Sequence, residues 1–188
     1  MSREGDPLPP GQRSVEWQRR VDIGPRPAFD PDSWQFVVAG LVEHEVRLTW
    51  QEFVDLPAVR VQADLHCVEG WSVVGLEWEG PRVRDLLAQA RPVEETRFIF
   101  VSSADGYSTS LPLEVALRED VVIARLRNGQ PIPDGEGGPL QLVVPGLYAY
   151  KWARWVQMID VLAEDRVGYW EAQGYSNTAD VWQNDRRA

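Results

Sequence analysis

The sequence predicts an α+β protein, with many short strands and few short helices, rather than a doubly wound parallel sheet. Short apolar runs of strand type recur along the chain, and the helical patterns between them are brief. Proline and glycine separate these segments at short intervals. With 188 residues, of which 44% are hydrophobic and 26% charged, the chain suits one globular domain with a short arm.

The N-terminal part divides into this arm and the start of the domain. Residues 1–32 are rich in proline, glycine and charge, which predicts an extended arm that either lies on the domain or frays from it. Residues 33–188 are expected to form the domain, which opens with a strand over residues 34–41. Thr49 and Glu52 have the spacing of a capping box, which predicts a short helix over residues 50–54 that ends before Pro57.

The next segment has a period of two. Every second residue is apolar in the stretch that contains Val59, Val61, Ala63 and Leu65, which predicts a strand with one buried face. In the same phase Cys67 points to the buried side, whereas His66 points to the opposite side.

The later elements follow from the same rules. Pro81 precedes a helix over residues 83–90, and Pro112 begins a short helix within residues 111–117. Asn128 and Gly129 are typical of a turn. Further strands are predicted over residues 97–102, 121–126, 141–144 and 156–161, and residues 169–188 are predicted to form a packed tail.

Charge and composition exclude several classes of function. Aspartate and glutamate outnumber lysine and arginine by 29 to 19, and the net charge of −10 disfavours binding to nucleic acids or to anionic membrane surfaces. No segment approaches the roughly 18 apolar residues of a membrane span, so no span is expected. The first residues lack the apolar centre of a signal peptide, so a cytoplasmic protein with a reduced thiol is expected.

The single cysteine, Cys67, has two interpretations. A lone buried cysteine is usually a small hydrophobic residue, and this reading is favoured on the residue alone. The sequence that follows, with Gly70 and Trp71, instead suggests a turn that leaves the thiol at the rim of a cavity, as a ligand or nucleophile would require. One cysteine excludes an intrachain disulfide, and two histidines leave little for a zinc site.

Two later segments could bind an anion. The loop over residues 135–139 (GEGGP) could present backbone amides, although such a loop is more often only a hairpin connection. Residues 145–155 (PGLYAYKWARW) interleave two cations, Lys151 and Arg154, with aromatic rings. This segment is either an aromatic strand with snorkelling cations or a site for a phosphate attached to a planar ring.

Taken together, the segments resemble the molybdopterin-binding domain of the sulfite oxidase family, and most closely its haem-free bacterial, YedY-like members. The resemblance covers nearly the whole chain in order. It is carried by LHCVEGWS (65–72), WEG (78–80) before VRDLLAQA, GYSTSLPL (106–113), NGQPIP (128–133), GGPLQLVVPG (137–146), KWARWVQMI (151–159) and GYWEAQGYSN (168–177).

This resemblance implies a molybdenum-molybdopterin cofactor whose metal takes one protein ligand, the thiolate of Cys67. It implies that Tyr107 lies near the metal as a catalytic residue. It also implies that the pterin and its phosphate contact a set of binding residues: His66, Cys67, Gln141, Lys151, Trp152 and Arg154. The reaction would be oxygen-atom transfer, either sulfite oxidation or reduction of an S- or N-oxide.

The resemblance also implies partners. The substrate would be a small oxyanion or oxide, and because the chain has no haem motif, electrons would pass to a separate redox protein. Family members often dimerise through an extra domain that this chain lacks, so a monomer is compatible with the sequence.

The chain departs from the family pattern at the expected phosphate site. Gln141 stands where an arginine is expected, and Glu136 stands where a polar residue is common. Phosphate binding is therefore either weakened or rebuilt with other arginines, namely Arg125, Arg127 or Arg154, with Arg20 or Arg26 as arm candidates. These departures motivate the alternative of a catalytically degenerate binding module. A thiol redox protein is the weakest alternative, because the chain has no resolving cysteine.

Overall fold

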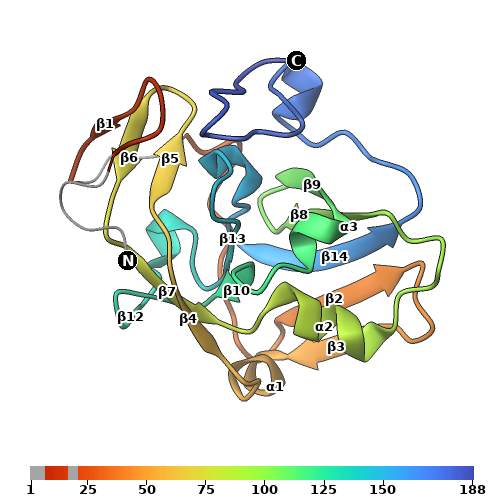
Figure 1. Cartoon of the computed structure of the whole chain (residues 1–188). Coiled ribbons are helices and arrows are strands. Elements are labelled where there is room, and N and C mark those ends of the chain that lie inside the picture. Colours follow the sequence, from red (N-terminus) through yellow and green to blue (C-terminus); the bar gives the residue numbers. More distant parts are fainter. Residues whose placement is uncertain (1–6, 17–20) are drawn as a thin grey trace.

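The computed structural model describes residues 7–16 and 21–188, and its strands form four sheets (Figure 1). The largest sheet has five strands in the order β3-β2-β14-β8-β9. They are β2 (Gln35–Gly40), β3 (Val46–Thr49), β8 (Phe98–Ser103), β9 (Ser108–Pro112) and β14 (Val156–Leu162). The central strand β14 runs parallel to β2 and antiparallel to β8, so late and early parts of the chain share one sheet.

Three smaller sheets complete the fold. A four-stranded sheet in the order β12-β11-β7-β4 contains β4 (Val59–Gln62), β7 (Glu77–Gly80), β11 (Leu126–Arg127) and β12 (Gln130–Pro131). A two-stranded sheet pairs β10 (Val122–Ala124) with β13 (Gln141–Val143). The third sheet, in the order β1-β6-β5, joins β1 (Arg13–Ser14), β6 (Trp71–Val73) and β5 (Leu65–Cys67). This last sheet places the arm strand β1 beside β6, which in turn pairs with β5, the strand that carries the cysteine.

The helices are short. Helix α1 (Trp50–Val54) has the predicted capping box, in which Thr49 and Glu52 each bond the other's backbone amide. Helix α2 (Val83–Ala90) buries one apolar face, and α3 (Leu113–Ala116) starts directly after Pro112. Single 3₁₀ turns occur at Asp134–Glu136, Ala149–Lys151 and Glu171–Gln173. None of the helices in the described ranges has the length and apolar character needed to cross a membrane.

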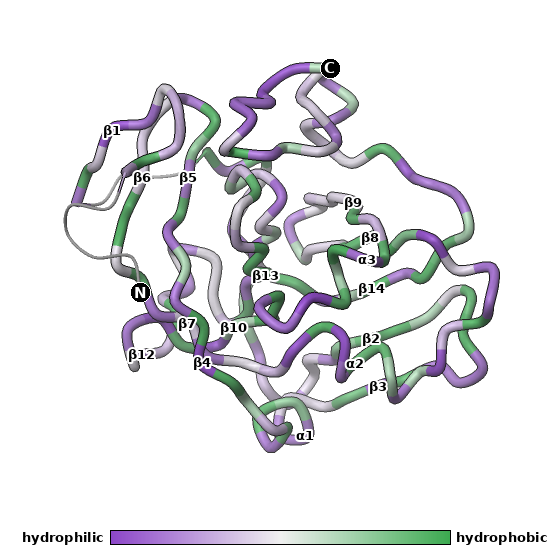
Figure 2. Tube along the Cα trace, viewed as in Figure 1, coloured by the Kyte–Doolittle hydropathy of each residue, from purple (hydrophilic) through white to green (hydrophobic). Residues whose placement is uncertain are grey.

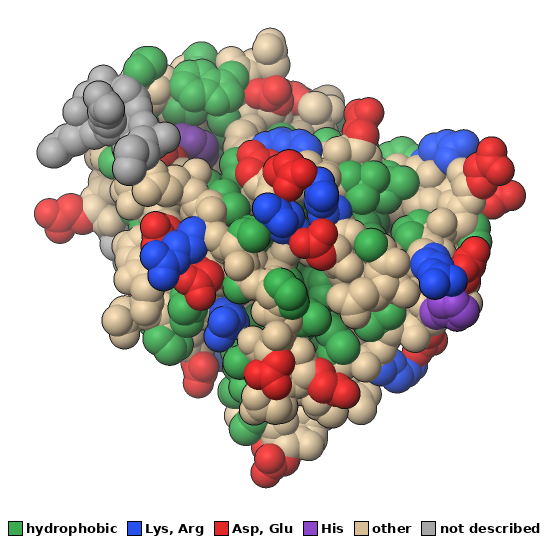
Figure 3. Space-filling view, turned by 60° about the horizontal axis from the view of Figure 1, so that its bottom comes forward, with side chains coloured by type: hydrophobic (Ala, Val, Ile, Leu, Met, Phe, Trp, Pro, Cys, Tyr) green, Lys and Arg blue, Asp and Glu red, His purple; other side chains and the backbone are tan. Residues whose placement is uncertain are grey.

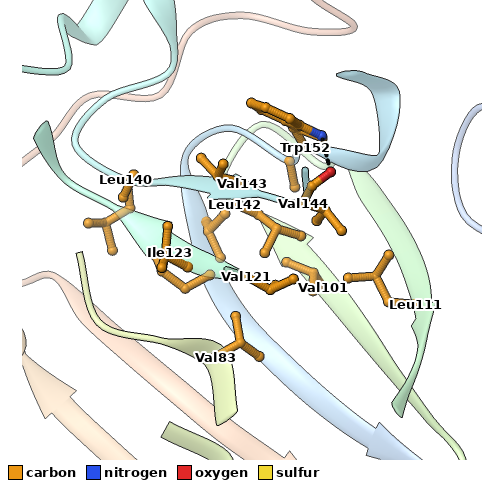
Figure 4. Close-up of a cluster of buried hydrophobic side chains, with 14 of the residues drawn as sticks. Val83, Val101, Leu111, Val121, Ile123, Leu140, Leu142, Val143, Val144 and Trp152 are labelled. Carbon is orange, nitrogen blue, oxygen red and sulfur yellow. Dashed lines mark hydrogen bonds between the residues drawn. The ribbon is translucent and has the colours of Figure 1, made fainter. Parts of the chain in front are cut away.

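The core lies where β10, β13 and the large sheet meet. Figure 4 shows Val121, Ile123, Leu142 and other aliphatic side chains packed together, with Trp152 above them. The Trp152 indole donates a hydrogen bond to the Val144 carbonyl at 2.9 Å, which satisfies its polar atom inside the core. The hydropathy colouring in Figure 2 shows the same concentration of hydrophobic residues along these inner strands.

The surface carries acidic and basic side chains side by side. Ion pairs such as Arg82–Asp85 and Arg118–Asp120 join residues close in sequence, and the face in Figure 3 shows both signs interspersed. On that face the arginines gather into no basic stripe of the kind that tracks a nucleic-acid backbone.

The predicted α+β, strand-rich architecture is confirmed, and most predicted elements are observed within one or two residues. The strand predicted through residues 59–67 is interrupted, because β4 ends at Gln62 and β5 begins at Leu65 in a different sheet. The predicted orientation of His66 is wrong: His66 is only 6% exposed, whereas Cys67 is partly exposed. Burial of Val61, Ala63 and Leu65 follows the predicted alternation, but His66 is buried as well, where it bonds Ser72 of the adjacent strand β6.

The described part of the arm lies on the domain. Ser14 of β1 pairs with Ser72 of β6, and Phe29 packs edge-on against Trp50 at a centroid distance of 4.8 Å. Arg20, one of the two arm arginines considered above, falls outside the described residues.

Candidate functional site

A pocket of about 120 Å³ contains Cys67 and several of the residues predicted to act with it. Its walls come from the arm, the turn after β5, the connection before β9, the segment after β13 and the C-terminal tail. The lining residues are Val21, Cys67, Val68, Glu69, Asp105, Tyr107, Ala149, Tyr150, Trp152, Arg154, Trp170 and Tyr175. The fold thus brings together Cys67, Tyr107, Trp152 and Arg154, which are far apart in the sequence.

Cys67 ends β5 and opens a tight turn. It pairs with Trp71 across the β5–β6 hairpin, and the amide of Gly70 donates to its carbonyl oxygen at 3.0 Å. Gly70 has a φ of +94°, and a Cβ there would lie 2.9 Å from the carbonyl oxygen of Gly11, so the turn requires glycine. The turn leaves the Cys67 side chain partly exposed at the pocket wall, as the second interpretation of the sequence requires.

Tyr107 faces the same pocket from the segment before β9 (Ser108–Pro112). Its hydroxyl donates to the carbonyl oxygen of Tyr150, and its backbone amide is held by the carboxylate of Asp105 at 3.0 Å. Burial, reinforced by the nearby carboxylate of Glu171, raises the pKa of Tyr107 well above its usual value. Tyr107 is therefore a neutral hydrogen-bond donor at physiological pH.

Arg154 is the one cation among the lining residues of the described chain. Its guanidinium donates to the Asp22 carboxylate at 2.8 Å and to the Val21 carbonyl at 2.7 Å, so the arm is fastened to it. Gly137 lies against its side chain, because a Cβ there would be 2.6 Å from the Arg154 Cγ. Burial raises the pKa of Asp22, but hydrogen bonds and charge from Arg154 and Arg26 outweigh this effect and hold it below the usual value.

Lys151 lies elsewhere. Its side chain is fully buried, and its ammonium donates to the Ser110 carbonyl at 3.0 Å, to Glu171 at 2.6 Å and to Asn177 at 2.9 Å. These acceptors use all three protons of the ammonium group. Burial lowers the pKa of Lys151, while the Glu171 carboxylate opposes this shift. The structure thus gives Lys151 protein partners and does not place it on the pocket lining.

His66 and Gln141 are also absent from the pocket lining. His66 lies behind the cysteine, with Nδ1 2.7 Å from the Ser72 hydroxyl, and burial lowers its pKa despite the charge of Asp64. Gln141 is fully buried in β13, where it pairs with Ala124.

The described arginines considered as replacements for a missing phosphate ligand each lie near a carboxylate. Arg127 is 2.5 Å from Glu136, Arg125 is 3.8 Å from Glu79, and Arg26 is 3.3 Å from Asp22. Any anion bound here therefore competes with carboxylates that the chain itself supplies.

Sequence reasoning missed several lining residues. Glu69, Trp170 and Tyr175 stand inside segments already quoted for their family resemblance, so a signal was present in the sequence. Asp105 also lines the pocket, and its partner is local, because it accepts from the Tyr107 amide two residues later. Asp22 does not line the pocket, and no local pattern marks it, because its partner Arg154 lies 132 residues away.

The donor set fits a cofactor that brings its own sulfur ligands. Within residues 7–16 and 21–188, no cluster of three or more histidine, cysteine or acidic side chains could hold a metal ion. The pocket instead offers one thiol, one cation, two carboxylates (Glu69 and Asp105) and five aromatic rings: Tyr107, Tyr150, Trp152, Trp170 and Tyr175. The thiol, the cation and the rings match a thiophilic metal, a phosphate and a flat ring, respectively.

Comparisons with known proteins agree with this chemistry. Residues 23–170 match the family model described as "oxidoreductase molybdopterin binding domain". The uncharacterized oxidoreductase YuiH of Bacillus subtilis (strain 168) is 34% identical over 95% of this chain and 91% of its own length. A putative protein-methionine-sulfoxide reductase subunit, YedZ1 of Azospira oryzae, is 31% identical over 78% of this chain and 56% of its own length.

More distant proteins share part of their length with this chain. Human mitochondrial sulfite oxidase is 27% identical over 80% of this chain, and the match spans 33% of sulfite oxidase. The crystal structure of the sulfane dehydrogenase SoxCD from Paracoccus pantotrophus superposes with a TM-score of 0.68 at 22% identity, covering 74% of this chain and 40% of that chain. This last similarity is one of fold.

Proposed function

The chain belongs to the family of oxidoreductases with a molybdopterin-binding domain of the sulfite oxidase type, and we propose that it transfers an oxygen atom at a molybdenum ion held by Cys67. The cofactor of this family is the molybdenum cofactor, which when bound supplies the two-electron oxygen-atom chemistry. The observation that carries the proposal is the position of Cys67, the sole cysteine, on the wall of the pocket that also contains Tyr107 and Arg154.

Each proposed role follows from what the side chain can do in its place. A thiolate is a soft ligand that suits a thiophilic metal, and Cys67, whose thiol would lose its proton on binding the metal, lines the pocket. Tyr107 is a neutral donor, and its hydroxyl can turn from the Tyr150 carbonyl to an oxygen atom in the pocket. The guanidinium of Arg154 is suited to bind the cofactor's phosphate, beside the glycine-rich loop over residues 135–138.

Charge in the pocket supports reduction of an uncharged oxide over oxidation of sulfite. Two carboxylates, Glu69 and Asp105, line the pocket, and its one cation among the described residues, Arg154, is the residue proposed for the cofactor's phosphate, so it leaves no cation there for an anionic substrate. A dianion such as sulfite needs converging cations, and these carboxylates oppose it. A neutral S- or N-oxide meets no such opposition, and its reduction consumes two electrons and two protons and releases the oxygen as water.

The electrons for this reduction would come from a separate redox protein. The cytoplasmic location expected from the sequence remains a prediction. This chain spans one third of human sulfite oxidase and 40% of the SoxCD chain. The activities of those larger proteins therefore enter this proposal only as chemistry that the shared domain could support.

The proposal is tested by expressing the protein in a host that makes the cofactor. We expect about one molybdenum and one pterin per chain, and faster reduction of a methyl sulfoxide with a dye donor than oxidation of sulfite. Tyr107→Phe should keep the metal and lose most of the turnover. Tyr169→Phe, whose ring packs 5.9 Å from that of Tyr107 without lining the pocket, is the matched control and should keep its activity.

Two results would overturn the proposal. Folded protein without molybdenum or pterin would favour the catalytically degenerate binding module, in which Asp22 and Glu136 have taken the place of a bound anion. Sulfite oxidation as the faster reaction would contradict the argument from pocket charge.

A further inference from the structure

The turn that carries the proposed metal ligand is held by side chains from both ends of the chain. We call residues 67–70 the wall loop, because Cys67, Val68 and Glu69 all line the pocket. Within the loop, one backbone hydrogen bond joins Gly70 to Cys67. Further hydrogen bonds to the carbonyl groups of Cys67, Val68 and Gly70 come from residues far away in the sequence.

The N-terminal arm supplies the first contact. The side-chain amide of Gln12 donates to the Cys67 carbonyl at 3.1 Å. Backbone pairing fixes where this side chain starts, because the amide of Arg13 donates to the Gly70 carbonyl at 3.1 Å and the amide of Val15 to the Ser72 carbonyl at 2.9 Å. Figure 1 shows β1 beside β6, next to the strand that ends in Cys67.

The orientation of the Gln12 amide is fixed by a chain of hydrogen bonds. Because its nitrogen donates to the Cys67 carbonyl, its oxygen accepts from the Ser72 hydroxyl at 3.0 Å. Ser72 has then used its one proton, so its oxygen accepts from Nδ1 of His66 at 2.7 Å. The series therefore has one direction only, and it ends on the carbonyl of the residue that carries the thiol.

The C-terminal tail supplies the second contact. The guanidinium of Arg186 donates to the Val68 carbonyl at 2.8 Å and to the Gly11 carbonyl at 3.1 Å. Its Nε donates to Asn184 at 2.8 Å, which fixes the group in place. Arg186 thus joins the wall loop to the arm at the residue next to Gln12.

We infer that Gln12 and Arg186 are positioning residues for the molybdenum ligand, an inference that rests on the proposed role of Cys67. The direction of a thiol is set by the backbone that bears it, and a four-residue turn has alternative conformations once its carbonyls lose their partners. By bonding the carbonyl groups of the wall loop, Gln12 and Arg186 restrict it to one conformation.

The experiment compares Gln12→Met and Arg186→Met with matched controls. Gln183→Met and Arg60→Met change exposed residues of the same types away from the wall loop, and the Arg60 guanidinium donates instead to Glu79 at 3.0 Å. We expect amide hydrogen exchange of residues 68–70 in cofactor-free protein to quicken by about three- to tenfold in the two test variants, the factor by which loss of one hydrogen bond shifts a local opening. The controls should match the wild type.

A readout on the loaded protein separates positioning from general stability. In the two test variants the half-time for molybdenum loss should shorten by a similar factor, and the Mo(V) electron paramagnetic resonance signal should change in shape. Gln12→Glu keeps the acceptor for Ser72 but places an oxygen against the Cys67 carbonyl, so it should behave like Gln12→Met.

Unchanged molybdenum retention and an unchanged Mo(V) signal in both test variants would overturn the inference, provided that Cys67→Ser loses the metal. If Cys67→Ser keeps the metal, the proposed ligand fails instead. In that case the hydrogen exchange of residues 68–70 alone tests whether Gln12 and Arg186 hold the wall loop. An unchanged exchange rate in both test variants would show that they do not.

Discussion

The ammonium of Lys151 lies 2.6 Å from Oε1 of Glu171, and both side chains are buried away from water. The pair is extended by Thr109, whose hydroxyl donates to the same carboxylate oxygen at 2.7 Å. This arrangement ties the segment after β13 to the tail, on which Trp170 and Tyr175 line the pocket. A buried ion pair of this kind specifies geometry more than it adds stability.

Removing one partner of this pair should be costly. Lys151→Met should destabilise the fold by about 3–5 kcal/mol, because it leaves the Glu171 carboxylate buried without its counter-ion. Lys151→Met/Glu171→Gln should recover part of this loss, as measured by urea unfolding. A double variant no more stable than the single one would contradict the structural role. Loss of molybdenum from folded Lys151→Met would instead favour the phosphate role that the sequence predicted.

The contact between the arm and Arg154 should depend on pH through Asp22. Its pKa is lower in the folded chain than the unperturbed value of 3.8, so the unfolded state binds the proton more readily. The stabilisation is therefore present above pH 3.8 and is lost as pH falls through the folded value. Asp22→Asn should show a shallower decline in unfolding free energy over this acid range. An unchanged acid profile would mean that the ion pair contributes nothing.

Arg154 is the residue through which the cofactor phosphate should be retained. Arg154→Ala should lower pterin retention after gel filtration by roughly ten- to a hundredfold, the range for loss of a charge-assisted hydrogen bond. Arg26→Ala is the matched control, because Arg26 shares Asp22 but does not line the pocket. Equal retention in the two variants would remove Arg154 from the site.

Charge selectivity of the pocket can be measured at Cys67 in cofactor-free protein. Cationic thiosulfonate reagents should modify this thiol faster than anionic ones, after correction for the intrinsic rates on a small thiol, because Glu69 and Asp105 face the same space. Glu69→Gln and Asp105→Asn should each reduce this ratio. The positive charge of Arg187, which lies 4.1 Å over the Tyr175 ring, favours the anionic reagents, so Arg187→Gln should raise the ratio. A ratio near one in all variants would refute the preference for uncharged substrates.

Local patterns predicted the elements but only part of the site. The alternation of Val61, Ala63 and Leu65 was sufficient for their burial, and the capping residues Thr49 and Glu52 were sufficient for α1. The same alternation failed at His66, because Ser72 of the neighbouring strand bonds its ring, and Ser72 in turn bonds Gln12 of the arm. A period-two pattern tells which face of a strand is apolar, but it does not tell whether another part of the chain covers the opposite face.

Prediction of the site depended on the order of several motifs along the chain more than on any single residue. The resemblance brought Cys67, Tyr107, Trp152 and Arg154 into one expectation, and all four line one pocket. Lys151 shows where such reasoning stops. Lys151 ends the 3₁₀ turn Ala149–Lys151, and its ammonium donates to Glu171 and Asn177, whereas Arg154, three residues later, donates to Asp22.

The central claim is that the Cys67 sulfur binds molybdenum. X-ray absorption at the molybdenum edge of the loaded protein counts the sulfur atoms bound to the metal. We predict that the wild type shows one sulfur neighbour more than Cys67→Ser, or that the variant binds no metal at all. An equal sulfur count in two fully loaded proteins would contradict the account.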